Sequence, residues 1–244
     1  MSRIHLFEFE DQKWFPSFLR NYGTDFLQFL SNMSKMYNPI IPVLEKGLEV
    51  AGMNQILDLG SGGGGGLLWL NEELKKNNPD IKIVLTDYYP NTTAFEYTSK
   101  QASNISYIKT PIDARDVPKD LKGLRTQFLS LQNAVDSNSS IAIFEGQERS
   151  FISLFAMFFS PITVLLMTPF IRPFKLGRIL FTYIIPIVPI FVLWDGLVSS
   201  LRTYSVKEMH QLVNSIDKHK SYDWEINKVK SGPSVILYLL GTPK

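Results

Sequence analysis

The fold of this chain is decided by the stretch Gln55-Ile56-Leu57-Asp58-Leu59-Gly60-Ser61-Gly62-Gly63-Gly64-Gly65-Gly66. Its apolar residues predict a short buried strand over 55–59 that carries one acid. The glycines predict a tight turn, because glycine adopts positive φ and lets a ligand approach the backbone closely. Residues 64–76 are helix-like, and such a helix points free N–H groups and its positive dipole end at a bound group.

The pattern Asp58-Leu-Gly60-Ser-Gly62-Gly-Gly64 resembles the Asp/Glu-x-Gly-x-Gly-x-Gly signature of class I S-adenosylmethionine-dependent methyltransferases. The resemblance implies that the glycines admit the amino-acid end of S-adenosylmethionine and that Asp58 orients the turn, or the ammonium through water. It also implies a second acid after the next strand, on the ribose hydroxyls. Asp87 fits, because it closes the apolar run 82–87, 29 residues after Asp58.

Two alternatives compete with this interpretation. A nicotinamide fingerprint places its acid about 20 residues on, so the position of Asp87 disfavours an NAD-dependent oxidoreductase. The glycine run taken alone is also compatible with a flexible loop. The strand before it, the helix after it and Asp87 together favour the S-adenosylmethionine site.

The composition sets broad limits on the protein. At 244 residues, with 45% hydrophobic and 20% charged residues, the chain is long enough for one α/β domain with insertions. A net charge of +2 without a basic, aromatic-rich run does not indicate nucleic acid binding. The absence of cysteine excludes disulfides, thiolate metal sites and a cysteine nucleophile. The scattered His5, His210 and His219 do not predict a metal site.

An aromatic and acidic arm opens the chain. Residues 3–20 crowd aromatic side chains beside acids, namely Phe7, Phe9, Trp14, Phe15 and Phe18 beside Glu8, Glu10 and Asp11. A surface arm this aromatic usually covers something. It either caps the core or folds over the ligand pocket, as N-terminal segments do in the resembled family, and both roles are compatible. The pattern over 7–16 also resembles a set of bacterial methyltransferases. No secretory signal is evident, and we expect a cytoplasmic protein.

The rest of the chain predicts an α/β fold with a seven-stranded, mostly parallel Rossmann-like sheet and helices on both faces. Further strands are expected at 105–109 and 139–145, and residues 222–230 and 234–241 predict a closing antiparallel hairpin split by Ser231-Gly232-Pro233. We expect four segments: an N-terminal helical cap (1–52), a core (53–150), an apolar helical insertion (151–202), and a C-terminal helix with the hairpin (203–244). The resemblance covers 40–150 and 203–244.

Ligands of parallel sheets bind outside the carboxyl ends of the strands, where several polar residues converge. The resemblance implies that an acid and a small residue after the third strand contact adenine, and Asp113-Ala114 match. The strand-four region, 124–134, lacks the acid that usually opens it in the family, and its polar candidates beside the methyl group are Ser130, Gln132 and Asn133. The cofactor-binding residues predicted on these grounds are Asp58, Gly60, Ser61, Gly62, Gly64, Asp87, Tyr88, Asp113, Ala114 and Gln132.

The insertion contains two uncharged apolar stretches, 151–171 and 179–194, separated by Arg172, Lys175 and Arg178. The first has the length of a membrane span, but the second has 16 residues, and prolines interrupt both. A two-pass hairpin would also carry the basic linker across the membrane. Three interpretations remain: a lid packed on the domain or on a second subunit, a monotopic anchor whose basic linker meets anionic lipid on the inner membrane face, and, ranked last, a span.

These features predict a methyltransferase that uses S-adenosylmethionine. An apolar insertion beside the methyl donor suggests an apolar or lipid-like acceptor, and a homodimer is one way to cover the insertion. If the acceptor is a hydroxyl, a base is needed, for which Glu145, Asp195 and Tyr204 are the candidates. For Asp195 the plainer alternative is an ion pair with Arg202 that ends the insertion. The rival from another class is a scaffold that binds the cofactor, or associates with membrane, without chemistry.

Overall fold

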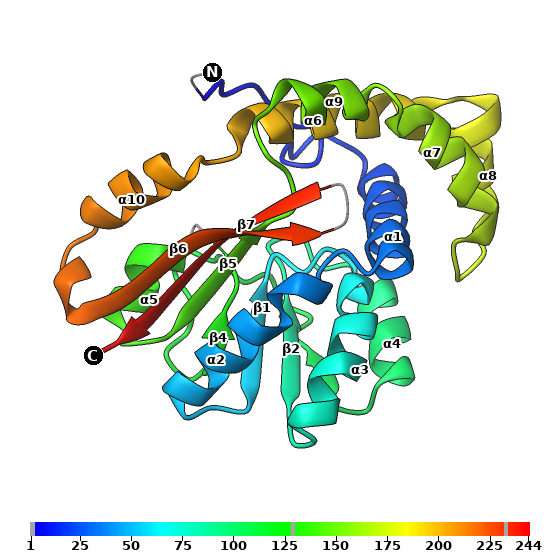
Figure 1. Cartoon of the computed structure of the whole chain (residues 1–244). Helices are drawn as coiled ribbons and strands as arrows, with labels where there is room; N and C mark the ends of the chain where they lie inside the picture. The colour runs from blue at the N-terminus through cyan, green and yellow to red at the C-terminus, as the bar shows by residue number, and fades with distance from the viewer. Residues whose placement is uncertain (1–2, 128–129, 232–233) are drawn as a thin grey trace.

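The computed structural model describes residues 3–127, 130–231 and 234–244, and it is built around one sheet of seven strands (Figure 1). The strand order is β3-β2-β1-β4-β5-β7-β6. The first five strands in sequence are parallel, and β7 runs antiparallel to both β5 and β6. The strands are β1 (Gln55–Leu59), β2 (Lys82–Thr86), β3 (Ile105–Tyr107), β4 (Leu124–Arg125), β5 (Ile141–Glu145), β6 (Tyr222–Ser231) and β7 (Ser234–Pro243). The predicted fold class is confirmed.

Strand β1 lies at the middle of the parallel part, between β2 and β4. It pairs in register with β2, from Gln55 opposite Lys82 to Leu59 opposite Thr86. The two strands therefore end at the same level, and the glycine turn after β1 lies beside the loop after β2. Because the chain order reverses on either side of β1, this edge of the sheet is where an open α/β fold binds ligands.

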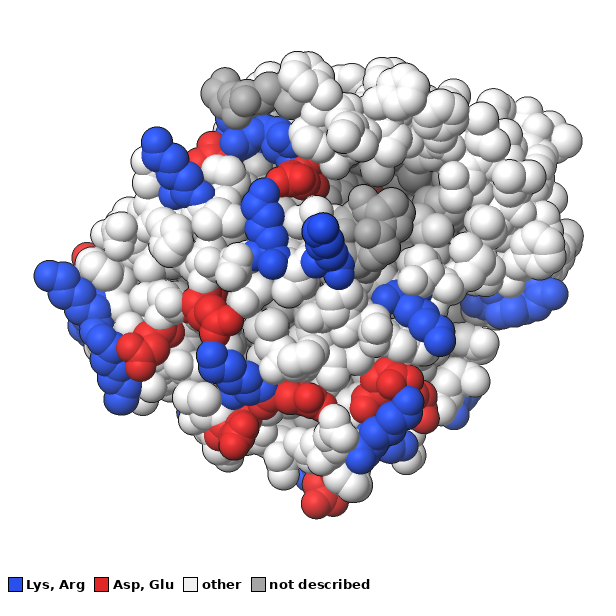
Figure 2. Space-filling model, viewed as in Figure 1, with Lys and Arg blue, Asp and Glu red and all other residues white. Residues whose placement is uncertain are grey.

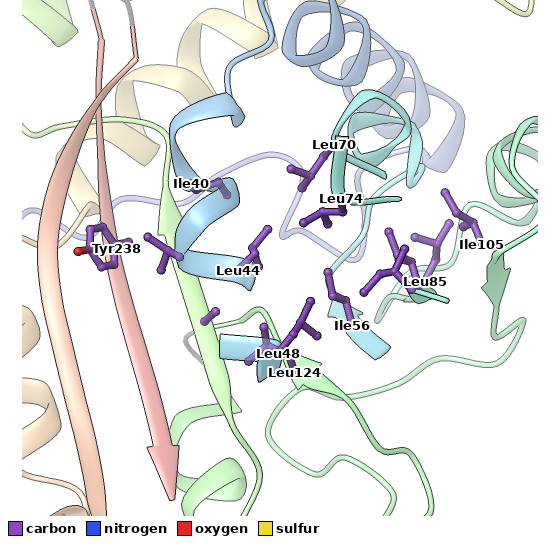
Figure 3. Close-up of a cluster of buried hydrophobic side chains, with 14 of the residues drawn as sticks. Ile40, Leu44, Leu48, Ile56, Leu70, Leu74, Leu85, Ile105, Leu124 and Tyr238 are labelled. Atoms are coloured by element: carbon purple, nitrogen blue, oxygen red, sulfur yellow. The ribbon is translucent and has the colours of Figure 1, made fainter. Parts of the chain in front are cut away.

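The main core lies between the sheet and helices α2 (Ile41–Ala51), α3 (Leu68–Asn77) and α4 (Thr92–Gln101). Figure 3 shows Leu44 of α2 pointing toward Leu74 of α3 above Ile56 of β1, while Leu48 of α2 lies beside Leu124 of β4. Helix α2 ends at Gly52, whose φ of 60° gives the left-handed C-cap that its sequence predicts. The 3₁₀ turn η2 (Gly65–Leu67) precedes α3, so the regular helix starts later than position 64.

Helix α10 (Val206–Asn214) packs on the other side of the sheet with α5 (Leu131–Asp136). Ser205 and Glu208 form the predicted capping box at its start. The closing hairpin is also confirmed, although Gly232 and Pro233 of its predicted turn lie outside the described residues. Strand β4 has only two residues, so the strand predicted from Leu124 onward is shorter than expected.

Helix α1 (Ser17–Ser34) packs against the insertion rather than beside α2 on the sheet. A separate apolar cluster joins Phe15, Leu19 and Phe26 to Val164 and Phe191. The insertion consists of α6 (Phe151–Met157), α7 (Ser160–Met167), α8 (Leu176–Ile179), a π-helical turn (Leu180–Ile184) and α9 (Ile187–Arg202), with the 3₁₀ turn Thr168–Phe170 after α7. In Figure 1 these helices lie across the upper edge of the molecule, beyond the sheet.

A buried ion cluster holds the insertion to α1. The Asp25 carboxylate accepts hydrogen bonds from Lys175 (2.7 Å) and from Arg178, and Arg178 also donates to the carbonyls of Ile171 and Pro173. The expectation that this basic linker meets lipid headgroups is therefore wrong for Lys175 and Arg178, because both turn inward to Asp25. Arg172 remains exposed.

The outer face of the insertion carries large exposed apolar side chains (Figure 2, upper right). Phe151, Ile152 and Leu176 are 78, 82 and 77% exposed. In the part of the chain that the structure describes, no single helix has the length and apolar character of a membrane span. Two pairs of consecutive helical segments have that length and apolar character only when their members are taken together, and each pair is bent at a short break. They are Phe151–Met157 with Ser160–Phe170, bent by 44°, and Leu176–Ile184 with Ile187–Arg202, bent by 79°. We call this surface of α6, α7, α8 and the π-helical turn the apolar face, and its most exposed side chains are Phe151, Ile152, Phe155, Phe158, Ile162, Leu166, Leu176 and Ile184.

Candidate functional site

A cavity of about 830 Å³ opens at the carboxyl ends of β1 and β2. Its size is in the range of small-molecule sites. The floor comes from the strand ends and the glycine turn, and the opposite wall comes from α1 and the N-terminal arm. Ten of the residues that line it are Glu10, Arg20, Thr24, Gln28, Tyr37, Asp58, Gly62, Asp87, Asp113 and Thr126.

The glycine turn adopts a conformation that requires glycine. Gly60, Gly62 and Gly64 have φ of 77°, 60° and 72°, in the left-handed region that other residues avoid. A Cβ on Gly64 would stand 2.2 Å from Leu85 Cδ1 of β2, so the turn also packs tightly on the neighbouring strand. The Ser61 hydroxyl donates to the Asp58 carbonyl (2.9 Å), which closes the turn.

Asp87 joins the two strand ends. Its Oδ2 accepts the backbone N–H of Gly62 (2.8 Å), and its Oδ1 accepts the backbone N–H of Tyr89 (2.7 Å). A carboxylate oxygen can accept more than one hydrogen bond, so each Asp87 oxygen can still accept a bond from a ligand hydroxyl. The residue predicted to hold ribose hydroxyls therefore lies on the floor of the cavity, directly beside the turn.

Asp58 is half-buried beneath the turn. Its Oδ1 accepts a hydrogen bond from the Thr126 hydroxyl (2.7 Å), and Thr126 in turn accepts the backbone N–H of Leu59 (3.2 Å). Burial raises the pKa of Asp58, and the hydrogen bonds from Ser61 and Thr126 oppose that rise. Burial also raises the pKa of the nearby Tyr37 phenol, reinforced by the charges of Asp58 and Glu145. A negative group in so dry a place favours a cationic ligand.

The residues predicted to contact adenine also line the cavity. Asp113 and Ala114 do so together with Tyr88. Asp113 forms a two-pronged ion pair with Arg115 (2.6 Å for the shorter contact), which lowers the pKa of Asp113 to about 2. Its carboxylate is therefore ionised and shared with Arg115, while the flat Tyr88 ring is 45% exposed.

Helix α1 covers the glycine turn with one polar face. The Gln28 carboxamide, with its oxygen toward the turn, accepts the N–H groups of Gly63 (2.6 Å) and Gly64 (3.0 Å). Thr24 and Ser31, one turn before and after it, face Gly62 and Gly66. Residues at these spacings share one side of a helix. Sequence reasoning recognised the apolar spacing of this helix but missed its polar face, although the spacing of Thr24, Gln28 and Ser31 could have shown it.

Two buried polar atoms at the cavity lack partners within the described residues. They are the amide nitrogen of Asn91, a residue 6% exposed, and the hydroxyl of Ser31. The Asn91 oxygen accepts the N–H of Ala94 as a helix cap, so its nitrogen remains the free donor. Buried polar groups are almost always hydrogen-bonded, and two such atoms in one cavity indicate a polar ligand. The residues present fit a nucleoside with an amino-acid end, as S-adenosylmethionine has.

The structure does not bring Gln132 to this cavity. Its side chain hydrogen-bonds Asp136 (3.1 Å) and accepts the N–H of Asp217 (3.3 Å) on the far side of α5. Because β4 ends after two residues, Thr126 and Gln127 occupy the strand-end position instead. The prediction that Gln132 lies at the ligand cavity is therefore wrong, and Thr126 and Gln127 line the cavity in its place.

Asp195 and Tyr204 likewise lie outside the lining that the described residues form. Asp195 of α9 accepts the backbone N–H groups of Phe9 (2.7 Å) and Glu10 (3.1 Å), so it anchors the arm. Tyr204 stacks under the Arg3 guanidinium, 3.6 Å from the ring centre. These placements correct the predicted catalytic roles of both residues.

Glu145 ends β5 beneath the arm, next to the lining residue Phe144. Burial raises the pKa of Glu145 to about 7, against the lowering effect of Arg3. Arg202 pairs with Glu8 (3.1 Å) and Asp11 (2.9 Å), rather than with Asp195 as the plainer interpretation supposed. The arm is therefore tied to α9 by ion pairs and backbone hydrogen bonds together.

The arm both caps the core and covers the cavity. Phe9 and Phe15 pack into the cluster with the insertion, whereas Glu10 and Asp11 line the cavity. Arg20, at the start of α1, lies 4.5 Å above the Tyr89 ring and holds the Glu10 carbonyl (2.8 Å). The two roles left open by the sequence are thus combined.

Comparisons with known proteins give structural matches only. No protein family model matches the sequence, and no curated protein sequence matches it. Among solved structures, the plantazolicin methyltransferase BpumL with S-adenosylhomocysteine is similar at 15% identity, with a TM-score of 0.49, over 93% of this chain and 88% of that one.

Two further structures are similar over about half of their own length. An O-methyltransferase family protein from Burkholderia thailandensis matches at 13% identity and a TM-score of 0.46, over 87% of this chain and 57% of that one. Human N-acetylserotonin methyltransferase with S-adenosylmethionine matches at 12% identity and a TM-score of 0.45, over 86% of this chain and 53% of that one. Likeness at this level assigns neither acceptor nor site residues. By its own strand order and its antiparallel β7, the chain has the Rossmann-like fold of the class I methyltransferases.

Proposed function

We propose that this protein is an S-adenosylmethionine-dependent methyltransferase. The single observation that carries the proposal is the hydrogen bond from Gly62 to Asp87, which joins the glycine turn to the acid of the next strand inside one cavity. A ligand with hydroxyls at one end and an ammonium at the other fits across these two strand ends. Asp58, half-buried and with a raised pKa, adds a site that favours positive charge.

The cofactor supplies a methyl group already activated by its positively charged sulfur, so the protein mainly positions and desolvates the reactants. In this assignment Asp87 binds the ribose hydroxyls, and the positive φ of Gly60 and Gly62 lets the turn approach the amino-acid end. Tyr88 and Ala114 enclose the base. The unpartnered amide nitrogen of Asn91 becomes satisfied by a ligand oxygen.

The acceptor in this proposal is an apolar or lipid-like small molecule. Leu27, Ile40 and Phe144 line the cavity beside its acids, and the apolar cluster of the insertion lies directly behind α1. An acceptor with an apolar body and one polar reacting group suits such a lining. Apolar side chains in the lining exclude water from the transfer step.

We further propose that the apolar face contacts the bilayer interface, on the cytoplasmic side of the membrane. Its side chains Phe155, Phe158 and Ile162 are more than half exposed, and residues 151–171 contain no charge. Burial of such side chains in lipid is favourable without any spanning helix. The alternative occupant is a second copy of the chain, which a homodimer in detergent-free solution would reveal.

Calorimetry tests the cofactor assignment. Purified protein is titrated with S-adenosylmethionine, S-adenosylhomocysteine and NADH. Binding of the first two, with no heat from NADH, is the expected result. Binding of NADH alone would instead establish a nicotinamide site. Release of labelled methyl to a panel of long-chain phenols, alcohols and amines then separates an enzyme from a scaffold that binds the cofactor without chemistry.

A further inference from the structure

In the part of the chain that the structure describes, the wall of the cavity opposite the glycine turn carries one carboxylate that accepts no hydrogen bond and forms no ion pair. Glu10 is half-buried in the arm and lines the cavity. Among the described residues, no hydrogen bond or ion pair is made to its carboxylate, whereas the neighbouring Glu8 and Asp11 both pair with Arg202. Glu10 is therefore the acid of this cluster that remains available to a bound molecule.

Hydrogen bonds to its backbone fix the position of Glu10. The Asp195 carboxylate of α9 accepts the Glu10 N–H (3.1 Å), and the Arg20 guanidinium of α1 donates to the Glu10 carbonyl (2.8 Å). The backbone at this residue is thus clamped from both sides. A Cβ on Gly23 would stand 2.6 Å from the Phe191 ring and 2.9 Å from Glu10 Oε1, so the absence of a side chain at 23 makes room for both the ring and the carboxylate.

We propose that Glu10 is the group that accepts the proton from a hydroxyl acceptor during methyl transfer. This inference rests on the proposed function and assigns a residue to its chemical step. The acceptor oxygen forms a bond to the methyl carbon while the bond from that carbon to sulfur breaks. Sulfur keeps the electron pair, and the hydroxyl proton passes to the Glu10 carboxylate, so no further reactant is needed.

The charges around Glu10 tune it for this task. Burial raises the pKa of Glu10 to about 8, reinforced by Asp195 of α9 and by Glu8 and Asp11 of the arm, and opposed by Arg20 of α1. A carboxylate of ordinary pKa near 4.5 is too weak a base to take a hydroxyl proton efficiently at neutral pH. The cation of the bound cofactor lowers the cost of ionising Glu10 in the same cavity.

The test compares two acceptor probes of equal shape, 4-octylphenol and 4-octylthiophenol, with labelled S-adenosylmethionine. At pH 8 the aryl thiol is ionised without help, because it is more acidic than a cysteine thiol of pKa about 8.5, whereas the phenol, with a pKa of about 10 as in tyrosine, still needs a base. Glu10→Gln should lower phenol methylation about 100-fold or more and change thiophenol methylation less than about threefold. In the wild type, phenol turnover should rise with pH through about 8, and this rise should be absent from Glu10→Gln.

Glu8→Gln is the matched control on the same arm. It removes a like charge that raises the pKa of Glu10, so the pH dependence should persist and move to lower pH. A readout without turnover is the melting temperature across pH 4.5 to 8. Glu10 keeps a proton in the native state that it loses in the unfolded state over this range, as Glu8 and Glu145 do up to about pH 7. Wild-type stability therefore falls with rising pH, and the stability of Glu10→Gln should fall less, because one of these protons is removed.

Several results would overturn the assignment of Glu10. They are an equal loss with both probes, unchanged phenol methylation in Glu10→Gln, or a pH profile that survives the substitution. Wild-type protein that methylates the thiophenol but never the phenol would also exclude it, and so would protein that binds the cofactor yet methylates neither. Loss of calorimetric binding of S-adenosylmethionine by the wild type would instead contradict the proposed function itself.

Discussion

Gly62 donates its backbone N–H to the carboxylate of Asp87 at 2.8 Å, and this contact joins the turn after β1 to the end of β2. Strands β1 and β2 pair in register, so the contact follows from the sheet rather than from a chance loop. An acid fixed in this way is held in place before a ligand arrives, and a preorganised acid loses little freedom on binding.

Asp87→Ala should abolish cofactor binding while the protein stays folded. The carboxylate is expected to accept two ribose hydroxyls, and hydrogen bonds to a charged group are worth about 1.5–3 kcal/mol each. The dissociation constant of S-adenosylhomocysteine should therefore rise about 100-fold or more by calorimetry. Asp80→Ala, an exposed acid in the turn before β2, is the control. Undiminished affinity in Asp87→Ala would refute the ribose role.

Gly64→Ala should destabilise the protein more than Gly52→Ala. Both glycines have left-handed φ, 72° and 60°, so each substitution costs about 1–2 kcal/mol in strain. The new Cβ at 64 also meets Leu85 Cδ1 at 2.2 Å, whereas nothing lies within 4 Å at 52. Overpacking adds about 1–3 kcal/mol. Urea unfolding measures both variants, and equal losses would show that the Leu85 contact yields freely.

Asp25→Ala should cost about 3–5 kcal/mol, because it leaves Arg178 buried without a counter-charge. Arg178 is 1% exposed and its guanidinium cannot lose its proton. The double variant Asp25→Ala/Arg178→Met should recover part of that loss. Lys175→Met, whose side chain is 24% exposed, should cost less than Asp25→Ala. Chemical denaturation of the wild type, Asp25→Ala, Arg178→Met and the double variant completes the cycle, and additive losses would argue against coupling between Asp25 and Arg178.

Glu208→Gln should destabilise the protein by about 1 kcal/mol at pH 7, because glutamine can still accept the Ser205 N–H but the charge that pairs with Arg149 is lost. The carboxylate accepts the Ser205 N–H (2.8 Å) and pairs with Arg149 (2.7 Å). These interactions lower the pKa of Glu208 from 4.5 to about 2. The stabilisation is therefore complete above about pH 4.5 and disappears as the pH falls toward 2.

The measurement is the difference in melting temperature between wild type and Glu208→Gln across that pH range. The difference should shrink steadily on acidification. A constant difference would mean that the variant acts through packing and not through the carboxylate charge.

Phe151→Ser/Phe155→Ser should weaken binding to anionic vesicles. The two rings are 78 and 66% exposed on the apolar face, and burial of a Phe side chain is worth about 1.5–3 kcal/mol. The partition coefficient in vesicle sedimentation should fall at least about tenfold. Val50→Ser/Tyr97→Ser, exposed apolar residues on α2 and α4, is the matched control. Unchanged partition with loss of a dimer in ultracentrifugation would assign the face to a second copy instead.

Local sequence predicted most of the sheet. Strands β1 and β2, the glycine turn, the Gly52 cap and the Ser205 capping box all depend on neighbouring residues, and apolar runs, glycines and caps encode such elements directly. The floor of the cavity followed for the same reason, because Asp58 and Asp87 each stand at a fixed offset from a strand end. The short β4 escaped prediction, and Gln132 was misplaced with it.

The sequence by itself determined that two acids and a glycine turn meet at the ends of adjoining strands, because parallel pairing brings the carboxyl ends of strands to one edge. Only the tertiary structure decided what lies opposite them. Glu10 is separated from Asp195 by most of the chain, and Asp25 from Arg178 likewise. Contacts of such separation leave no periodic signal in the sequence, since they depend on how whole helices pack.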